Sequence, residues 1–439
     1  MRRGRWRRTH CLCLREHVAP DGHGRAADRG HLHQLGAAVA QDRRNAGGRR
    51  APPQRRHFPH ARQARPWSGR MSIVSVTARI AQLENVTLRT SYGANVTRRA
   101  HVFVAIADDE GHVGHGEGSP LPHFSGERAG EMKIVIEEVF GPALVGIDPN
   151  DIEQAHQALE RALPHHHASK AALINALHDL QGKRAGLSAG AFLGGKLRTR
   201  VPVGGAVGIE DEETVICRVR ALWEQGITTV KFKIGADLDR DIRIIKRLRD
   251  EFPSELEIRA DANAGFGFSQ AQRFLRAIAD CRLQYLEQPL PGHDWKGLAR
   301  LRGLGTPIAA DESLFGLSDA LGLVAAEAVD VFIIKLIKLG GLHQARKVVG
   351  LAEAAGIACV AVSPYETSLG VSANLHLAAS SSAFRFAAEL GVGVSSVHLE
   401  GSDAVTVTQG EALVPQGPGL GIGMPAGFFA DTQARARAV

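Results

Sequence analysis

VKFKI at residues 230–234 is the first of five apolar runs that each contain or end on a charged residue. The others are EIRAD at 257–261, QYLEQP at 284–289, PIAADES at 307–313 and VFIIKL at 331–336. Between the runs, apolar residues such as Ile242, Ile245 and Leu248 recur at helical spacing. This alternation predicts consecutive βα units, in which each run is a strand and each intervening segment is a crossover helix.

The charged residues recur at nearly equal intervals. The intervals are 28, 26, 24 and 24 residues between Lys233, Asp261, Glu287, Asp311 and Lys335. Each interval holds about one strand and one helix, so these residues should lie at the same level on successive parallel strands. The pattern predicts an α/β fold of the TIM-barrel type, in which active sites lie at the carboxyl ends of the strands.

Three acids in this set predict a metal site. Asp261, Glu287 and Asp311 would meet at one mouth of the barrel, and two carboxylates roughly 4 Å apart repel by about 4 kcal/mol at an effective dielectric near ~20. A bound cation would relieve that repulsion. Ligands that are all oxygen suit a hard divalent ion, so Mg²⁺ is the favoured ion and Mn²⁺ is the alternative.

Three lysines predict acid/base chemistry at the same mouth. Lys231 and Lys233 are two residues apart on one strand, so their side chains point to the same face. The ammonium group of Lys231 should lower the pKa of Lys233 and make it a usable general base. Lys335 comes from roughly the opposite wall of the barrel. A substrate between Lys233 and Lys335 could lose a proton on one face and regain it on the other.

With these motifs, the chain resembles the enolase superfamily, in the muconate-lactonising branch of the mandelate racemase/muconate lactonizing enzyme family. The resemblance rests on KFK at 231–233, DAN at 261–263, EQP at 287–289, ADES at 310–313 and IKLIKLGG at 334–341. It extends from about Ser72 to Gly423. It implies a modified TIM barrel, (β/α)7β, with an α+β capping domain built from the N-terminal region and the C-terminal tail.

The resemblance also implies the roles of the site residues. Asp261, Glu287 and Asp311 would hold the metal, Lys233 and Lys335 would be the acid/base pair, and Lys231 would modulate them. The alternative to an active site is that these residues form surface ion pairs at the strand ends. For any single Asp or Lys that alternative is the better interpretation, but for the whole set together the active site is. Lys338 lies beyond its strand and is predicted to be an ordinary loop residue.

The implied enzyme is a Mg²⁺-dependent isomerase that abstracts the α-proton of a small carboxylate substrate through a metal-stabilised enediolate. Muconate-type cycloisomerisation and racemisation or epimerisation are the expected reactions. A lyase of the same branch, such as o-succinylbenzoate synthase, and an acid-sugar dehydratase are the alternatives.

Two strand ends narrow the choice of reaction. SPYE at 363–366 lacks the His that the mandelate-racemase branch carries after strand seven, which disfavours that branch and most acid-sugar dehydratases. AELG at 388–391 lacks the Asp-x-Asp of dipeptide epimerases, whereas its Glu389-Leu390 resembles the cycloisomerases. Glu389 is either a substrate-side acid or part of a buried ion pair. Asn263 and Tyr365 complete the residues expected to contact the substrate or to support the site.

The charge of the chain is unevenly distributed. The whole chain of 439 residues has a formal net charge of +7, but residues 1–70 hold 17 Arg, no Lys and four acids, a net of +13, which leaves 7 − 13 = −6 for the remainder. The acidic remainder lacks a basic patch with interleaved aromatic residues, so a nucleic-acid partner is not expected. No apolar run is long enough to span a membrane.

The cysteines indicate a compartment. Cys217, Cys281 and Cys359 have apolar neighbours and no CxxC spacing, so buried free thiols and a cytoplasmic location are expected. The family further implies a homo-oligomer.

The predicted domains follow from these patterns. Residues 1–70 are expected to be a basic disordered leader, an organellar transit segment or sequence that is not part of the natural protein; we favour the last and hypothesise that translation begins at Met71. Residues 71–165 form the α+β cap, 166–394 the barrel, and 395–439 return to the cap. Strand one of the barrel is predicted at 201–208, strand seven at 357–364 and strand eight, FRFAAEL, at 384–390. Loops 89–98 and 116–127 of the cap should touch the substrate.

Overall fold

The computed structural model describes residues 71–84, 88–91, 98–391 and 399–430. The predicted leader, most of the predicted substrate loop at 89–98 and the predicted boundary at 394/395 lie outside the described residues.

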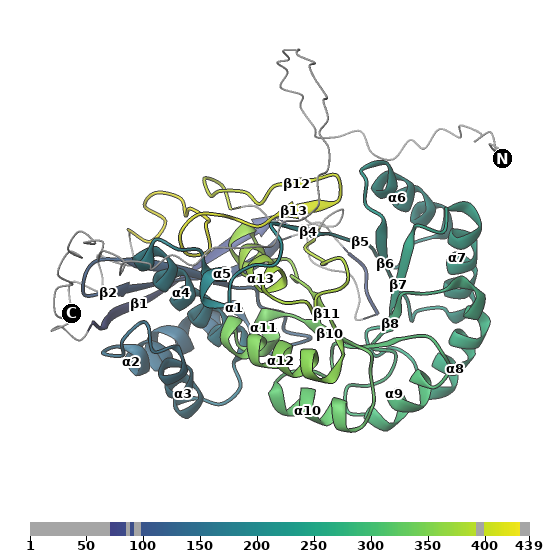
Figure 1. The fold of residues 1–439 in the computed structure, drawn as a ribbon, viewed down its shortest axis with the longest axis horizontal. Coiled ribbons are helices and arrows are strands. Elements are labelled where there is room, and N and C mark those ends of the chain that lie inside the picture. The colour runs from purple at the N-terminus through teal and green to yellow at the C-terminus, as the bar shows by residue number, and fades with distance from the viewer. Residues whose placement is uncertain (1–70, 85–87, 92–97, 392–398, 431–439) are drawn as a thin grey trace, which may run out of the picture. The chain divides into compact units, whose positions relative to one another are not determined.

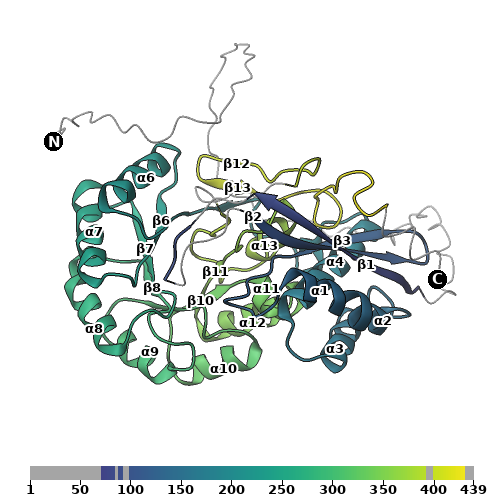
Figure 2. The ribbon, with the colours of Figure 1, turned by 180° about the vertical axis from the view of Figure 1, so that it is seen from behind.

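An antiparallel three-stranded sheet begins the described chain. Strands β1 (Ile73–Glu84), β2 (Arg98–Asp108) and β3 (Val113–Gly118) pair in sequence order. Gly111, in the predicted turn between β2 and β3, has a φ of +88°, a conformation that glycine adopts without steric cost. The next elements are α1 (Ala129–Val135), a π-helical turn (Ile136–Phe140), α2 (Gly141–Leu144) and α3 (Ile152–Ala162), which lie beside this sheet (Figure 2).

Seven parallel strands form a second, curled sheet. In the order of the chain, which is also their spatial order, they are β5 (Gly205–Val207), β6 (Thr229–Lys233), β7 (Glu257–Asp261), β8 (Tyr285–Glu287), β9 (Ile308–Ala310), β10 (Val331–Ile334) and β11 (Ala358–Ala361). Figure 1 shows successive helices around the outside of these strands. They are α6 (Glu212–Glu224), α7 (Leu238–Glu251), α8 (Phe268–Ala277), α9 (Trp295–Arg302), α10 (Leu317–Ala325) and α12 (Leu342–Ala355), with a 3₁₀ turn at Ala279–Cys281. The predicted α/β barrel class with a strand-rich cap is confirmed.

The predicted eighth barrel strand at 384–390 is wrong as a strand, although the segment lies where that strand was expected. Ala388 and Glu389 form single parallel bridges to Val203 and Val362. The backbone N–H of Ala388 donates to Pro202 at 2.7 Å, and that of Glu389 donates to Ala361 at 2.9 Å. The carbonyl of Ala387 accepts instead from the Arg259 side chain, at 2.9 Å. A side chain therefore replaces a ladder bond, and the segment joins the two ends of the sheet through isolated bridges.

One long helix lies between the two sheets' cores. Helix α4 (His167–Ala185) is buried on all sides from Ala168 to Gly182. It packs against β3, α11 (Leu336–Leu339) and α12. A helix with neighbours on several sides cannot show the one-sided polarity of a surface helix.

The C-terminal segment contacts both parts of the described chain. Strands β12 (Val407–Thr408) and β13 (Glu411–Leu413) form a hairpin, and β13 pairs with β4 (Arg200–Pro202), which leads into the barrel. Further on, Gly419 bridges to Ser188, just before α5 (Ala189–Phe192). The last barrel helix, α13 (Ser368–Ser380), contacts both β3 and β4.

The three cysteines of the body differ from one another. Cys281 and Cys359 are buried free thiols, as predicted. Cys217, on α6, is half-buried, so its burial is less complete than predicted. Among the described residues, no helix combines the length and apolar character that a membrane crossing would need.

Candidate active site

The register of the barrel strands brings the predicted charged residues to one rim. Lys233 on β6 is paired in register with Asp261 on β7, and Asp261 with Glu287 on β8. Asp311 comes directly after β9, and Lys335 directly after β10. Each strand ends at this level because a crossover helix must begin there, so side chains far apart in sequence become neighbours.

All three predicted metal ligands are fully buried. The carboxylate of Asp261 contacts the ammonium group of Lys233, Glu287 accepts from Lys231 at 3.1 Å, and Asp311 is ion-paired with Lys335. Burial and the negative charge of Asp261 raise the pKa of Glu287 well above its usual range. A cation bound beside Glu287 would oppose this shift, because a nearby positive charge favours the ionised carboxylate.

Burial also opposes ionisation of the two aspartates, but nearby ammonium groups outweigh it. Lys233 and Lys231 hold the pKa of Asp261 below its usual value. Lys335 and Lys338 hold the pKa of Asp311 below its usual value more strongly. Both aspartates are therefore ionised, which is the state that a metal ligand requires.

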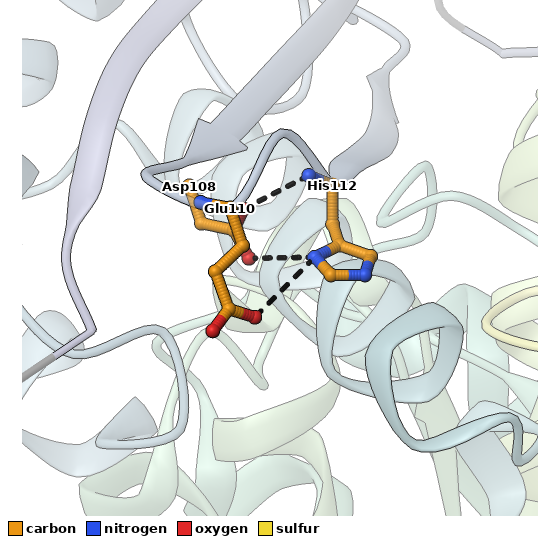
Figure 3. A group of neighbouring side chains, drawn as sticks. All are labelled: Asp108, Glu110 and His112. Atoms are coloured by element: carbon orange, nitrogen blue, oxygen red, sulfur yellow. Dashed lines mark hydrogen bonds and ion pairs between the residues drawn. The ribbon is translucent and has the colours of Figure 1, made fainter. Parts of the chain in front are cut away.

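The donor chemistry of this trio fits Mg²⁺, whereas its side-chain spacing in the described structure is not that of a closed metal cage. Among the described residues, one group brings three candidate ligand atoms within 4.8 Å of one another, and it lies elsewhere: Asp108, Glu110 and His112. Figure 3 shows these side chains facing one another at the turn between β2 and β3. Arg184 ion-pairs with both Asp108 and Glu110, so a cation already balances that group.

Lys231 and Lys335 are surrounded by acids. Lys231 contacts Glu287 and ion-pairs with Glu389. Burial alone would lower its pKa, but Glu287, Glu389 and Asp261 raise it well above the usual range. For Lys335, too, burial is outweighed by Asp311, and its pKa is raised.

The cap reaches Lys335 directly. The ring centroid of Phe124, from the predicted substrate loop at 116–127, lies 4.4 Å from the Lys335 ammonium nitrogen. A cation over an aromatic face is attracted by the ring quadrupole. The cap loop therefore contacts one of the two lysines that the sequence singles out.

Lys338 corrects the sequence prediction of an ordinary loop residue. It lies on the short helix α11 and is fully buried. Its ammonium group donates to the Asp311 carboxylate at 2.8 Å, to the Asp311 carbonyl at 2.7 Å and to the Ile333 carbonyl at 2.9 Å. The turn of α11 directs the side chain back toward the rim. The signal in the sequence was its spacing of three residues from Lys335, which is one helical turn.

Glu389 lies in a buried ionic network, which is compatible with both of the roles left open for it. It accepts from Arg259 at 3.1 Å and from the Tyr285 hydroxyl at 3.0 Å, and it pairs with Lys231. Arg259 and Tyr285 escaped sequence reasoning. The available signal for Arg259 was a charged residue inside an apolar strand.

A cavity of about 430 Å³ joins the rim to the cap. Lys231, Lys233, Lys335, Asn263 and Tyr365 line it, together with Glu389. Asn263 accepts from Lys233 at 3.1 Å. The cavity thus collects the predicted lysines and all three of the predicted substrate or supporting residues, and each of the three carboxylates contacts one of these lysines.

Comparisons with known proteins match both parts of the chain. Residues 74–194 match the family described as mandelate racemase / muconate lactonizing enzyme, N-terminal domain, and residues 215–426 match the one described as enolase C-terminal domain-like. A hydrophobic dipeptide epimerase of Enterococcus faecalis is 33% identical over 312 residues, 70% of this chain and 87% of that protein.

Two further relatives extend the comparison. Muconate cycloisomerase 1 of Rhodococcus opacus is 31% identical over 358 residues, 80% of this chain and 96% of that protein. The crystal structure of a dipeptide epimerase from Cytophaga hutchinsonii, complexed with Mg and the dipeptide D-Ala-L-Val, has a TM-score of 0.77 at 26% identity. The match covers 82% of this chain and 98% of that chain.

Proposed function

The chain belongs to the mandelate racemase/muconate lactonizing enzyme branch of the enolase superfamily and is an isomerase, and from this premise we propose that it removes the α-proton of a small-molecule carboxylate with the help of Mg²⁺. Mn²⁺ is the alternative ion. Cycloisomerisation and racemisation or epimerisation are the two reactions that its relatives' names support.

In this proposal Asp261, Glu287 and Asp311 hold the metal. The ion, when bound, supplies positive charge that makes the α-proton of a nearby carboxylate more acidic. Lys233 removes the proton from one face, and Lys335 returns a proton to the other. Lys231 stays charged among its three acids and keeps the interior electrostatically balanced.

The observation that carries the proposal is the shared cavity. Lys233 and Lys335 line the same space, over three buried carboxylates, although 102 positions separate them along the chain (335 − 233). A base on each side of one substrate position is the arrangement that a two-base proton transfer needs.

Exchange of the α-proton with deuterated water tests the proposal. The protein would be incubated with Mg²⁺ in D₂O and a panel of muconates, N-acyl amino acids, dipeptides and hydroxy acids, with NMR following the α-position. We expect Lys233→Ala or Lys335→Ala to lower turnover by roughly 10² to 10⁴. Lys347→Ala, which removes an exposed lysine ion-paired with Glu153, is the matched control. Near-normal rates in both active-site variants, or exchange that survives removal of Mg²⁺, would contradict the mechanism.

A further inference from the structure

We infer that the cap end of the cavity binds a second anionic group of the substrate, so that the substrate is a dianion rather than a zwitterionic dipeptide. The inference rests on the proposed function for the other end of the cavity. The inference goes beyond the proposed function by assigning a second binding site and the chemical class of its ligand.

Three arginines from the cap line the cavity, whereas the three predicted metal-binding carboxylates are not among its described lining residues. Arg98 and Arg99 begin β2, and Arg128 immediately precedes α1; all three line the cavity. Arg98 is ion-paired with Glu84 at 2.9 Å and is largely exposed, so water screens its charge more than that of the half-buried Arg99. We therefore take Arg99 as the first candidate and Arg128 as the second. A guanidinium group is the side chain best suited to bidentate recognition of a carboxylate.

Arg99 is held in place by the barrel. Its guanidinium carbon lies 4.2 Å from the ring centroid of Tyr365, which follows β11 and also lines the cavity. Burial lowers the pKa of Arg99, so its charge is partly desolvated. A desolvated, stacked guanidinium interacts more strongly with an anion than a solvated one does, because the local dielectric is lower.

The cavity offers no comparable partner for an ammonium group. Among the described residues that line it, Glu389 is the one acid, against the three arginines and Lys231, Lys233 and Lys335. Glu389 is already engaged by Lys231, Arg259 and the Tyr285 hydroxyl. The free amino group of a dipeptide would have to enter a positively charged space and compete with these contacts.

A series of three ligands that differ in one terminal group tests the inference. They are N-succinyl-L-leucine, its terminal carboxamide and N-(4-aminobutanoyl)-L-leucine, which share the α-carboxylate, the amide and nearly the same tail length. Isothermal titration calorimetry with Mg²⁺ present would measure the affinity of each. We expect the succinyl compound to bind about 10- to 100-fold more tightly than the other two, as charge-assisted hydrogen bonds predict.

Substitutions locate the preference on the cap. Arg99→Gln and Arg128→Gln should each reduce the advantage of the succinyl compound, and the double variant should abolish it. Arg273→Gln is the matched control, since Arg273 pairs with Asp239 on the exposed surface of the barrel helices. The thermal transition of each variant would show that it is folded.

Three results would overturn the inference. The first is that the succinyl compound binds no more tightly than the carboxamide, or that neither binds. The second is that the ammonium compound binds more tightly than the succinyl compound. The third is that the preference for the succinyl compound persists in the double variant. Because binding needs no proton transfer, α-proton exchange in the same ligands tests the proposed function separately. A retained preference without exchange would count against the proposed chemistry and in favour of the anion site.

Discussion

Lys338 shows how a single buried charge stabilises the candidate active site. With Lys335, it gives Asp311 two ammonium partners, and it also ties α11 to the end of β10 through the Ile333 carbonyl. A buried carboxylate that lost one of these partners would keep its desolvation cost without the compensating attraction. Lys338 therefore positions the predicted metal ligand, although it does not line the cavity among the described residues.

We expect Lys338→Met to lower the free energy of unfolding by about 3 to 5 kcal/mol, because it breaks a buried pair and leaves Asp311 under-compensated. Urea unfolding followed by circular dichroism would measure the change. Lys347→Met removes an exposed ion pair with Glu153 and should cost less than about 1 kcal/mol. Equal effects of the two substitutions would rule out the positioning role.

Glu366 is a buried ionisable group, and it makes stability depend on pH. Its carboxyl accepts from Asn374 at 3.1 Å. Burial and the neighbouring Glu117 raise its pKa to about 8. Glu117 itself is buried and accepts from the Thr367 backbone at 2.9 Å, so it cannot move away from Glu366 without losing that bond.

An acid whose pKa is higher in the folded state stabilises that state at low pH. The contribution of Glu366 should be complete below its unfolded pKa of 4.5 and should be lost as pH rises to about 8. We expect the stability advantage of wild type over Glu366→Gln to fall by about 1.4 kcal/mol per pH unit between those limits. Urea unfolding at pH 5, 6, 7 and 8 measures it; parallel pH profiles would show that Glu366 ionises normally.

At the scale of elements, two glycines set the distance between β3 and α4. Gly114 and Gly116 are two residues apart on β3, so both face the helix. A Cβ atom at Gly116 would overlap the carbonyl oxygen of Ala172, and one at Gly114 that of Ala176. Small residues on both elements allow this close approach, which is how α4 fills the space between the cap and α11.

We expect Gly116→Ala to lower the free energy of unfolding by about 2 kcal/mol or more, because the overlap is with backbone and cannot be relieved by a side-chain rotation. Thermal unfolding would record the loss. Gly130→Ala on α1, where an added Cβ meets nothing within 4 Å, should be neutral or slightly stabilising. A Gly116→Ala protein as stable as wild type would mean that β3 and α4 can separate freely.

At the scale of the whole described chain, the cap and the barrel share their apolar cores. Along β2, Val102, Val104 and Ile106 pack in the cap core, whereas Phe103 and Ala105 pack in the larger core of the barrel. Conversely, Ile337 of α11 packs in the cap core. Residues that belong to one part by sequence and to the other by packing should make the two parts unfold together.

We therefore expect one cooperative thermal transition. Ile337→Ala should destabilise the protein by about 2 to 5 kcal/mol and lower the temperature of that transition without splitting it. Differential scanning calorimetry would detect it, with Leu321→Ala, at an exposed position of α10, as the control. Two separated transitions in wild type or in the Ile337 variant would show that the cap and barrel are independent.

What the sequence alone determined was the set of strand ends. Apolar runs and helical spacing are local patterns, and equal intervals place Lys233, Asp261 and Glu287 at one level because successive parallel strands share a register. The α/β class with its separate cap followed from such patterns, the family followed from the motifs, and both are confirmed. The roles of the lysines and acids in catalysis stay predictions.

Only the tertiary structure decided which other charges meet these residues. Lys338, one helical turn after its strand, and Arg259, within a strand, each contact a buried acid. Arg99, near the start of a strand of the cap, lines the cavity. No local sequence pattern predicts any of these three contacts. The expected eighth strand likewise forms isolated bridges, and beside them the Arg259 side chain donates to the Ala387 carbonyl. The direction and partners of a buried side chain depend on elements distant in sequence, and periodicity carries no information about those contacts.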